Sequence, residues 1–211
     1  MIRIGVLGGS FDPVHRGHLE LAKDAADQAG LNEVILSPTR IQPFKQGIQV
    51  TSGDDRLNML SLAAEADERI RVSRYELDKE GVSYTYLTLR HFRKLYEDTS
   101  SKDGNEEVKL YFISGTDSFL KIETWMEAGE ILRNYSHIVG SRPGYMEQEL
   151  RQCIDRVHKN YGTEVLKIEN KQLDISSTLI RERLAEGLPV DDLLSDKVER
   201  YIREHGLYGL S

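Results

Sequence analysis

The chain has 211 residues, enough to bury a sizeable core and few enough to form one domain. Hydrophobic residues make up 39% and charged residues 30%, the balance of a globular protein and not of a disordered one. The formal net charge of −7 argues against a general nucleic-acid binder, which needs a basic face, but it permits a small anionic ligand at a local positive site.

The single cysteine, Cys153, excludes an intramolecular disulfide and is expected to be an ordinary helix-face residue in ELRQCIDRVHKNY. No stretch approaches the roughly 20 apolar residues of a membrane span, and MIRIGVLGG lacks the layout of a signal peptide. We therefore expect a cytoplasmic protein without a membrane or nucleic-acid partner. The sequence leaves the oligomeric state open, a homo-oligomer included.

Strand-like and helix-like segments alternate through the first half of the chain. They are a strand over Ile2–Gly8, a helix from about Gly17 to a C-cap near Gly30, a strand over Glu33–Pro38, a helix capped by Thr51 or Ser52, a strand over Arg69–Leu77 and a helix after Ser83. The polar segment Asp98–Glu107 has no periodicity and predicts a loose loop.

The second half continues the pattern. Strands are expected over Val108–Gly115, His137–Ser141 and Glu164–Asn170, followed by two helices over Ser177–Gly187 and Asp196–Gly206. Strands separated by helices of ten or more residues are joined in parallel by crossovers. The sequence therefore predicts one α/β domain over residues 1–211, doubly wound, with a mainly parallel sheet and helices on both faces.

The first expected strand ends in a glycine-rich turn that leads directly into a helix. Gly8 and Gly9 allow backbone N–H groups to approach an anion closely, and the helix start adds free N–H groups and a positive dipole end. His15 and His18, three residues apart, fall on one face of the first turn, where both rings can donate hydrogen bonds to phosphate oxygens. A tight turn with incidental histidines is the alternative, and the two commonest nucleotide fingerprints, GxGxxG and GxxxxGK[ST], are absent.

The complete string GGSFDPVHRGHL resembles the GGxFxPxHxGH motif of the HxGH nucleotidylyltransferases, which have a Rossmann-like fold. Near the other end, ISSTLIRERL over Ile175–Leu184 resembles the ISSTxxR motif of the same superfamily. In that stretch Ser176 is suited to cap a helix, which leaves the hydroxyl and backbone N–H groups of Ser177 and Thr178 at its start, with Arg181 one turn on. The resemblance implies transfer of a nucleoside monophosphate from a nucleoside triphosphate to an acceptor phosphate.

Four further stretches resemble bacterial nicotinate-nucleotide adenylyltransferases, so that the likeness covers essentially the whole chain. They are GVSYTYLTL, FISGTDSFLKIETWMEAGEIL, GSRPGY and LPVDDLLSDKVERYIREHGLYG. This resemblance implies that ATP and nicotinate mononucleotide react to give deamido-NAD and pyrophosphate. It also implies Mg²⁺, which would arrive on the ATP phosphates and not in a cage of protein ligands.

The same resemblance assigns site residues. His15, His18 and Arg181 are implied as catalytic residues, and helices over residues 176–205 would complete the nucleotide site. The implied ATP site comprises Gly8, Gly9, Ser10, Phe11, His15, His18, Gly115, Asp117, Ser177, Thr178 and Arg181. The implied nicotinate mononucleotide site comprises Lys45, Tyr84, Thr85, Trp125 and Arg142, with the indole stacked on the pyridine ring.

One segment departs from the family. Where many members read PNxxPPHK, this chain has PTRIQPFK over Pro38–Lys45, with Phe44 in the place of the histidine. The usual contact of that loop with substrate is therefore in question, although Lys45 or Arg40 could supply charge there.

The sequence fits other activities to different degrees. Transfer to nicotinamide mononucleotide, or to both mononucleotides, stays open because it depends on a few contacts around Thr85. Phosphopantetheine as acceptor fits the chain length and the Ser-Tyr-Thr and Trp125 segments poorly. A non-catalytic nucleotide sensor would be expected to lack His18 or Arg181, and a tRNA synthetase fragment would need a lysine loop that the sequence does not have.

Overall fold

The computed structural model describes residues 1–41, 51–103, 107–141, 144, 146–170 and 175–209. This part of the chain contains a parallel six-stranded sheet with the strand order β3-β2-β1-β4-β5-β6. The strands are β1 (Ile2–Gly9), β2 (Glu33–Pro38), β3 (Ile70–Val72), β4 (Val108–Gly115), β5 (Ser136–Ser141) and β6 (Val165–Glu169).

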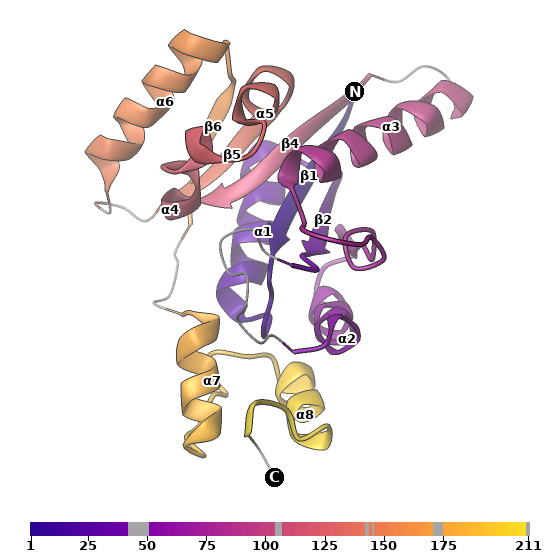
Figure 1. The fold of residues 1–211 in the computed structure, drawn as a ribbon, viewed down its shortest axis with the longest axis vertical. Helices are drawn as coiled ribbons and strands as arrows, with labels where there is room; N and C mark the ends of the chain where they lie inside the picture. Colours follow the sequence, from indigo (N-terminus) through magenta and orange to yellow (C-terminus); the bar gives the residue numbers. More distant parts are fainter. Residues whose placement is uncertain (42–50, 104–106, 142–143, 145, 171–174, 210–211) are drawn as a thin grey trace.

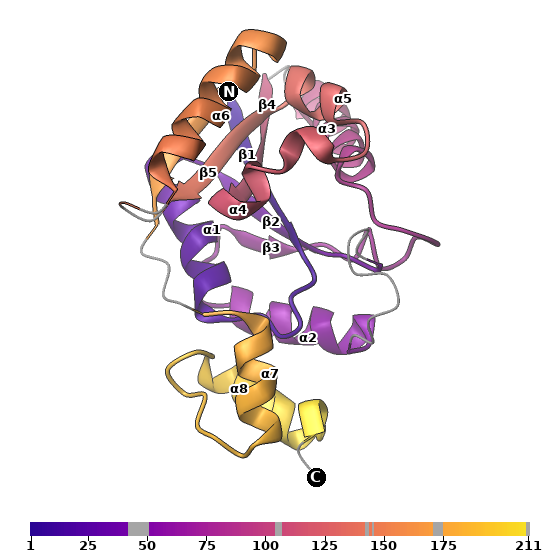
Figure 2. The same cartoon turned by 60° about the vertical axis from the view of Figure 1, so that its left-hand side comes forward.

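Helices cover both faces of the sheet (Figures 1 and 2). One core packs the sheet against α1 (Arg16–Ala29) and α2 (Gly53–Ala64), and includes residues of α7 (Ser177–Ala185) and α8 (Asp196–Glu204). The other core lies under α3 (Thr85–Asp103), α4 (Thr116–Phe119), η2 (Ile122–Thr124), α5 (Ala128–Asn134) and α6 (Glu147–Tyr161). A short turn, η3 (Leu207–Gly209), follows α8. The predicted doubly wound α/β fold is confirmed, with a sheet that is entirely parallel in the described residues.

Strand β1 shows how the sequence builds both cores at once. Ile4 and Val6 enter the core under α3, whereas Leu7 enters the core under α1, as the two-residue period of a strand requires. Gly5 lies where a Cβ atom would come within 2.6 Å of Ile113 Cδ1 and 2.7 Å of Leu31 Cδ1, so that packing on this face excludes a side chain. The central strand is thus fixed on both faces before it reaches the glycine-rich turn.

The predicted helix caps agree with the structure. Gly30 ends α1 with a φ of +62° and returns its N–H to the carbonyl of Ala26. Ser52 caps α2 by accepting a hydrogen bond from the N–H of Asp55, and Ser176 caps α7 by accepting one from the N–H of Leu179.

Two predicted elements are wrong. The strand expected over Arg69–Leu77 is limited to Ile70–Val72, because the chain then forms a turn in which the N–H groups of Leu77 and Asp78 donate to the Arg74 carbonyl. The loop expected over Asp98–Glu107 is helical as far as Asp103, the end of α3. This polar segment continues a helix whose earlier turns pack on the core through Leu89 and Phe92, so it needs no apolar face of its own.

None of the helices within the described ranges has the length and apolar character needed to cross a bilayer.

His137 provides a test of the core on the α4 side. It is fully buried in β5, with the Phe112 and Phe119 rings at 6.0 and 5.7 Å, and burial lowers the pKa of its imidazole to about 4, an effect that the backbone of Ile131 offsets only in part. As the pH falls, this histidine is therefore protonated in the unfolded chain before it is protonated in the folded protein. Its contribution to the free energy of unfolding is present above pH ~6.5 and is lost as the pH falls below that value.

We expect wild-type protein to lose about 2 kcal/mol more unfolding free energy between pH 7 and pH 5 than a His137→Leu variant, which lacks this titration. Urea unfolding at both pH values measures the difference. Equal losses for the two proteins would mean that His137 is not a buried neutral histidine.

Candidate active site

The larger cavity lies at the point where the strand order reverses, between β1 and β4. It has a volume of about 720 Å³ and opens at the carboxyl ends of these two strands, the usual ligand position in an open parallel sheet. Its wall is formed by residues of four segments: Leu7–Ser10 of β1 and its turn, His15, Gly17, His18 and Leu21 of α1, Phe112–Gly115, Asp117 and Ser118 around β4, and Ile175–Thr178 at the start of α7, together with Trp125.

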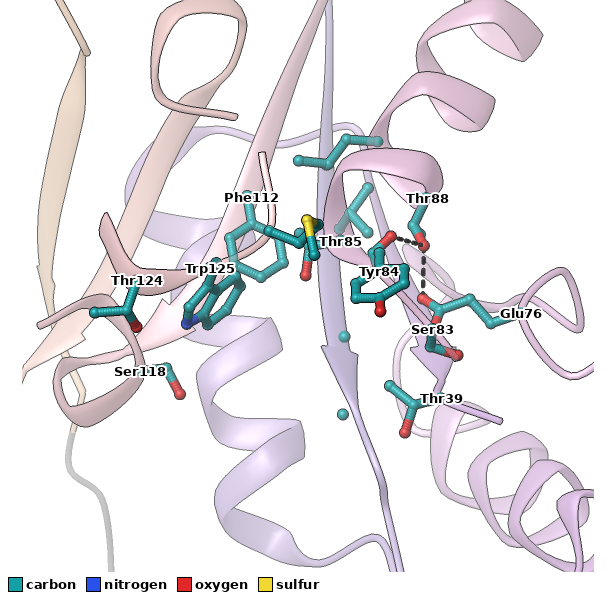
Figure 3. A pocket seen from close by; sticks show the side chains of 15 residues that line it. Thr39, Glu76, Ser83, Tyr84, Thr85, Thr88, Phe112, Ser118, Thr124 and Trp125 are labelled. Atoms are coloured by element: carbon teal, nitrogen blue, oxygen red, sulfur yellow. Dashed lines mark hydrogen bonds between the residues drawn. The ribbon is translucent and has the colours of Figure 1, made fainter. Parts of the chain in front are cut away.

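A second cavity, of about 360 Å³, is shown in Figure 3, and its lining overlaps that of the first. The two share Gly8, Gly9, Phe112, Ser118 and Trp125. The rest of the smaller cavity is formed mainly by the β2 end, the chain before α3 and the first turns of α3: Thr39, Glu76, Ser83, Tyr84, Thr85, Thr88 and Leu89. The two cavities therefore lie side by side at the carboxyl end of β1 and share part of their lining.

The two histidines stack on each other at the start of α1. His15 is the N-cap residue, His18 lies in the first turn, and their ring centroids are 3.6 Å apart. The backbone N–H of His15 donates to His18 Nδ1 at 3.3 Å, so that the proton of a neutral His18 ring is on Nε2. His15 Nδ1 is buried and has no hydrogen-bond partner among the described residues, which leaves Nε2 as the nitrogen available to a ligand.

Both imidazoles are neutral at pH 7 in the free protein. Burial lowers the pKa of His15 to about 4. Burial also holds the pKa of His18 well below its usual value, and the neighbouring His15 lowers it further. A neutral imidazole keeps one N–H donor, so each ring can still bind a phosphate oxygen.

The β1–α1 loop, residues 10–15, is held by side chains from distant segments. Arg56 Nη1 of α2 donates to the Ser10 carbonyl at 2.7 Å. From α7, Arg181 Nη1 donates to the Asp12 carbonyl at 2.6 Å and Ser177 Oγ donates to the Pro13 carbonyl at 2.9 Å. Phe11 within this loop has a φ of +48° and sets its ring edge-on to His18, 4.9 Å between centroids.

The structure brings most of the predicted site residues together. The larger cavity is lined by Gly8, Gly9, Ser10, His15, His18, Gly115, Asp117, Ser177 and Thr178. Tyr84, Thr85 and Trp125 line the smaller cavity. Arg181 and Phe11 line neither cavity. The Arg181 guanidinium is engaged with the Asp12 carbonyl and, at 3.3 Å, with Thr178 Oγ1, and Phe11 is fully buried in the core. Lys45, Phe44 and Arg142 lie outside the described residues.

Sequence reasoning missed Glu76, whose buried carboxylate stands in the wall of the smaller cavity (Figure 3). It accepts hydrogen bonds from Ser37 Oγ at 3.0 Å and Thr88 Oγ1 at 2.9 Å, and burial raises its pKa. These bonds join the end of β2 to the first turns of α3. An acidic residue near the end of the expected strand Arg69–Leu77 gave no signal of this role.

The donors around the larger cavity suit an anion better than a hard cation. They are mainly imidazole nitrogens, serine and threonine hydroxyls and the backbone N–H groups at the start of α7. Among the described residues no group of three or more His, Cys, Asp or Glu side chains could hold a metal ion.

A parallel sheet with an anion-binding turn and two joined cavities at its switch point defines a nucleotide-binding α/β protein. In agreement, the sequence model of the Cytidylyltransferase-like family matches residues 6–183. Over 98% of its length the chain is 38% identical to the probable nicotinate-nucleotide adenylyltransferase of Thermoanaerobacter sp. (strain X514), of which it covers 94%. Over the same share it is 40% identical to that of Desulfitobacterium hafniense (strain DSM 10664 / DCB-2), of which it covers 95%. The chain belongs to the nicotinate-nucleotide adenylyltransferase family, whose members are nucleotidyltransferases.

Solved structures show the same fold. Plasmodium falciparum nicotinic acid mononucleotide adenylyltransferase, complexed with NaAD, matches 100% of this chain and 99% of its own with a TM-score of 0.77 at 18% identity. A putative nicotinate-nucleotide adenylyltransferase from Vibrio parahaemolyticus matches 100% of this chain and 98% of its own with a TM-score of 0.68, also at 18% identity.

Gly8 and Gly5, three residues apart on β1, give opposite predictions. A Cβ atom at Gly8 would meet no atom within 4 Å and would project into space that both cavities share, whereas one at Gly5 would clash with Ile113 and Leu31. We expect Gly8→Ala to keep its unfolding free energy within about 0.5 kcal/mol but to weaken ATP binding about tenfold, or about 1.4 kcal/mol.

Gly5→Ala is the matched control, and we expect it to lose about 1–3 kcal/mol of stability through overpacking. Urea unfolding and calorimetric titration with ATP measure the two effects. A Gly8→Ala protein that binds ATP as tightly as wild type would show that the nucleotide does not approach this glycine.

Proposed function

We propose that this protein transfers the adenylyl group of ATP to nicotinate mononucleotide, giving deamido-NAD and pyrophosphate. The observation that carries the proposal is the pair of cavities that meet along Gly8, Gly9 and Trp125, one lined by anion donors and the other by aromatic and hydroxyl groups. The names of the relatives support the same reaction. We further propose that residues 1–211 act as one domain, with the helices over 176–205 completing the nucleotide site.

The chemistry needs no nucleophile from the enzyme. A phosphate oxygen of the mononucleotide attacks the α-phosphorus of ATP, and a new O–P bond forms. The bond from that phosphorus to the bridging oxygen breaks, and its electron pair leaves with pyrophosphate. Catalysis then consists of aligning the two phosphates and stabilising charge on the equatorial oxygens.

In this proposal, His15 and His18 donate from Nε2 to the triphosphate and to the reacting phosphorus centre. Ser177 and Thr178 add hydroxyl and backbone donors at the start of α7. Arg181 binds the β- or γ-phosphate, because a guanidinium has five N–H groups and its two hydrogen bonds, to the Asp12 carbonyl and the Thr178 hydroxyl, leave others free. Gly115 and Asp117 meet the ribose or adenine.

Mg²⁺ is proposed to arrive bound to the ATP phosphates and to keep several water ligands, since the donors of the larger cavity suit phosphate. It would add positive charge at the triphosphate.

The smaller cavity suits a pyridine ring that carries a carboxylate. Trp125 packs edge-to-face on Phe112, with centroids 5.7 Å apart, which leaves an indole face for an electron-poor ring. Tyr84 and Thr85 stand at the N-terminus of α3, where first-turn N–H groups lack intrahelical acceptors and the helix dipole favours a negative group. This charge preference supports the acid over the amide. Contacts of Lys45 and Arg142 with the mononucleotide, and the cytoplasmic location, remain predictions.

Pyrophosphate release with ATP and either mononucleotide, at equal concentrations, tests the proposal. We expect kcat/KM for nicotinate mononucleotide to exceed that for the amide by about tenfold or more, because the amide lacks the charge that the α3 N-terminus favours. Comparable values would indicate a dual-specificity enzyme. ATP binding without release from either substrate would overturn the assignment of the acceptor.

A His18→Asn variant tests the Nε2 donor of His18 separately from the hydrogen bond that its Nδ1 accepts from the His15 N–H. Asparagine retains a side-chain acceptor for the His15 N–H but removes the Nε2 proton. We expect kcat to fall by about 10²–10³, as on loss of one transition-state donor, with little change in the KM of the mononucleotide. Steady-state kinetics on both substrates give the result, and an unchanged kcat would exclude His18 as a donor in the transition state.

A further inference from the structure

The C-terminal turn reaches the loop that carries the histidines. The hydroxyl of Tyr208, in η3, donates to Asp12 Oδ1 at 2.7 Å, although the two residues lie 196 positions apart. Tyr208 adopts a φ of +61°, in the left-handed region that non-glycine residues rarely enter, and burial is the main cause of the raised pKa of its phenol. A tyrosine held in this backbone conformation is a specific attachment of the turn and not a loose chain end.

Asp12 joins three parts of the molecule. The residue is 4% exposed, and the only other hydrogen bond that its carboxylate accepts from the described residues is a long one, 3.4 Å, from the N–H of Thr51. Its carbonyl accepts from Arg181 of α7. Among the described residues, the hydroxyl of Tyr208 therefore donates the one short hydrogen bond, 2.7 Å, that holds this carboxylate.

The charge of Asp12 is matched by Arg56, which is 2% exposed. Burial lowers the pKa of that guanidinium, and the neighbouring Asp12 carboxylate is the largest effect that opposes this. Arg56 in turn donates from Nε to the Thr51 carbonyl and from Nη1 to the Ser10 carbonyl. A rotation of the Asp12 carboxylate would thus disturb the support of the β1–α1 loop from both of its sides.

We infer that Tyr208 is a positioning residue for adenylyl transfer, which acts through Asp12 on the β1–α1 loop and so on the alignment of His15 and His18. This inference rests on the proposed function of the larger cavity. Tyr208 itself lines neither cavity, so it acts only through other residues. The C-terminal turn becomes part of the catalytic arrangement, although it is the last described segment of the chain.

The alternative is that this hydroxyl only docks the C-terminal turn. Tyr201 supplies a matched control, because its hydroxyl also donates to an aspartate, Asp55 Oδ1, at 2.9 Å, and joins α8 to α2. Asn58 Nδ2 donates to the same hydroxyl at 3.0 Å. Tyr201 and Asp55 line neither cavity, and within the described part of the chain neither side chain forms a hydrogen bond with the β1–α1 loop. Tyr208→Phe and Tyr201→Phe each delete one hydroxyl that donates to an aspartate, and both keep the ring.

The test compares kcat and KM of both variants with wild type, and follows the ring signals of His15 and His18 by NMR without substrate. For Tyr208→Phe we expect kcat to fall at least tenfold, the mononucleotide KM to stay within about twofold, and both histidine signals to shift. Tyr201→Phe should keep its kcat within about twofold and leave those signals unchanged, with a similar loss in thermal midpoint.

Equal kcat values in the two variants, with unshifted histidine signals, would overturn the inference. If wild type releases no pyrophosphate with either mononucleotide, the proposed function fails. The histidine signals then still decide the inference, since a shift confined to Tyr208→Phe supports the positioning role.

Discussion

The β1–α1 loop leaves the sheet before a helix can satisfy its backbone, so its carbonyl groups need donors from elsewhere. An unpaired buried carbonyl costs about 1–3 kcal/mol. The donors to the Ser10, Asp12 and Pro13 carbonyls come from Arg56 of α2 and from Arg181 and Ser177 of α7. These donors also offset the partial negative charge of the carbonyl oxygens, which would otherwise repel an anion bound nearby. The conformation of the loop thus depends on α2 and α7, two helices that lie far from it in the sequence.

This dependence explains the position of the C-terminal helices. α7 begins at the mouth of the larger cavity, with Ser176 as its cap and Ser177 bonded to Pro13. Its place is reinforced by the segment before α8, since Arg16 at the start of α1 donates to the carbonyls of Asp191 and Leu194. One of the four segments that line the larger cavity therefore comes from a part of the chain that contributes no strand to the sheet. A substitution that displaces α7 would therefore affect the larger cavity through the hydrogen bonds from Ser177 and Arg181 to the backbone of the β1–α1 loop.

The features predicted well from the sequence are those with local causes. The glycine-rich turn before α1, the Gly30 C-cap and the Ser176 cap each depend on residues within one turn of one another. β3 is shorter than predicted because Glu76, four residues beyond its end, turns inward to the hydroxyls of Ser37 and Thr88, which are distant in sequence. The hydrogen-bond partner of Arg181 could not be predicted for the same reason. The spacing indicated that Arg181 lies one helical turn after Ser177, but not that it contacts the Asp12 carbonyl, which is distant in sequence.

The charge of the free site follows from the stacked histidines. Two imidazolium rings 3.6 Å apart would repel each other, and burial already disfavours the first proton, so both rings stay neutral without ligand. In a chain with a net charge of −7, the attraction for an anion then comes from the guanidinium of Arg181 and from the N-termini of α1 and α7. A bound triphosphate would raise both histidine pKa values, because a nearby negative charge favours the protonated ring. Nucleotide binding therefore favours the protonated form of each ring, while the short distance between the stacked rings opposes protonation of both.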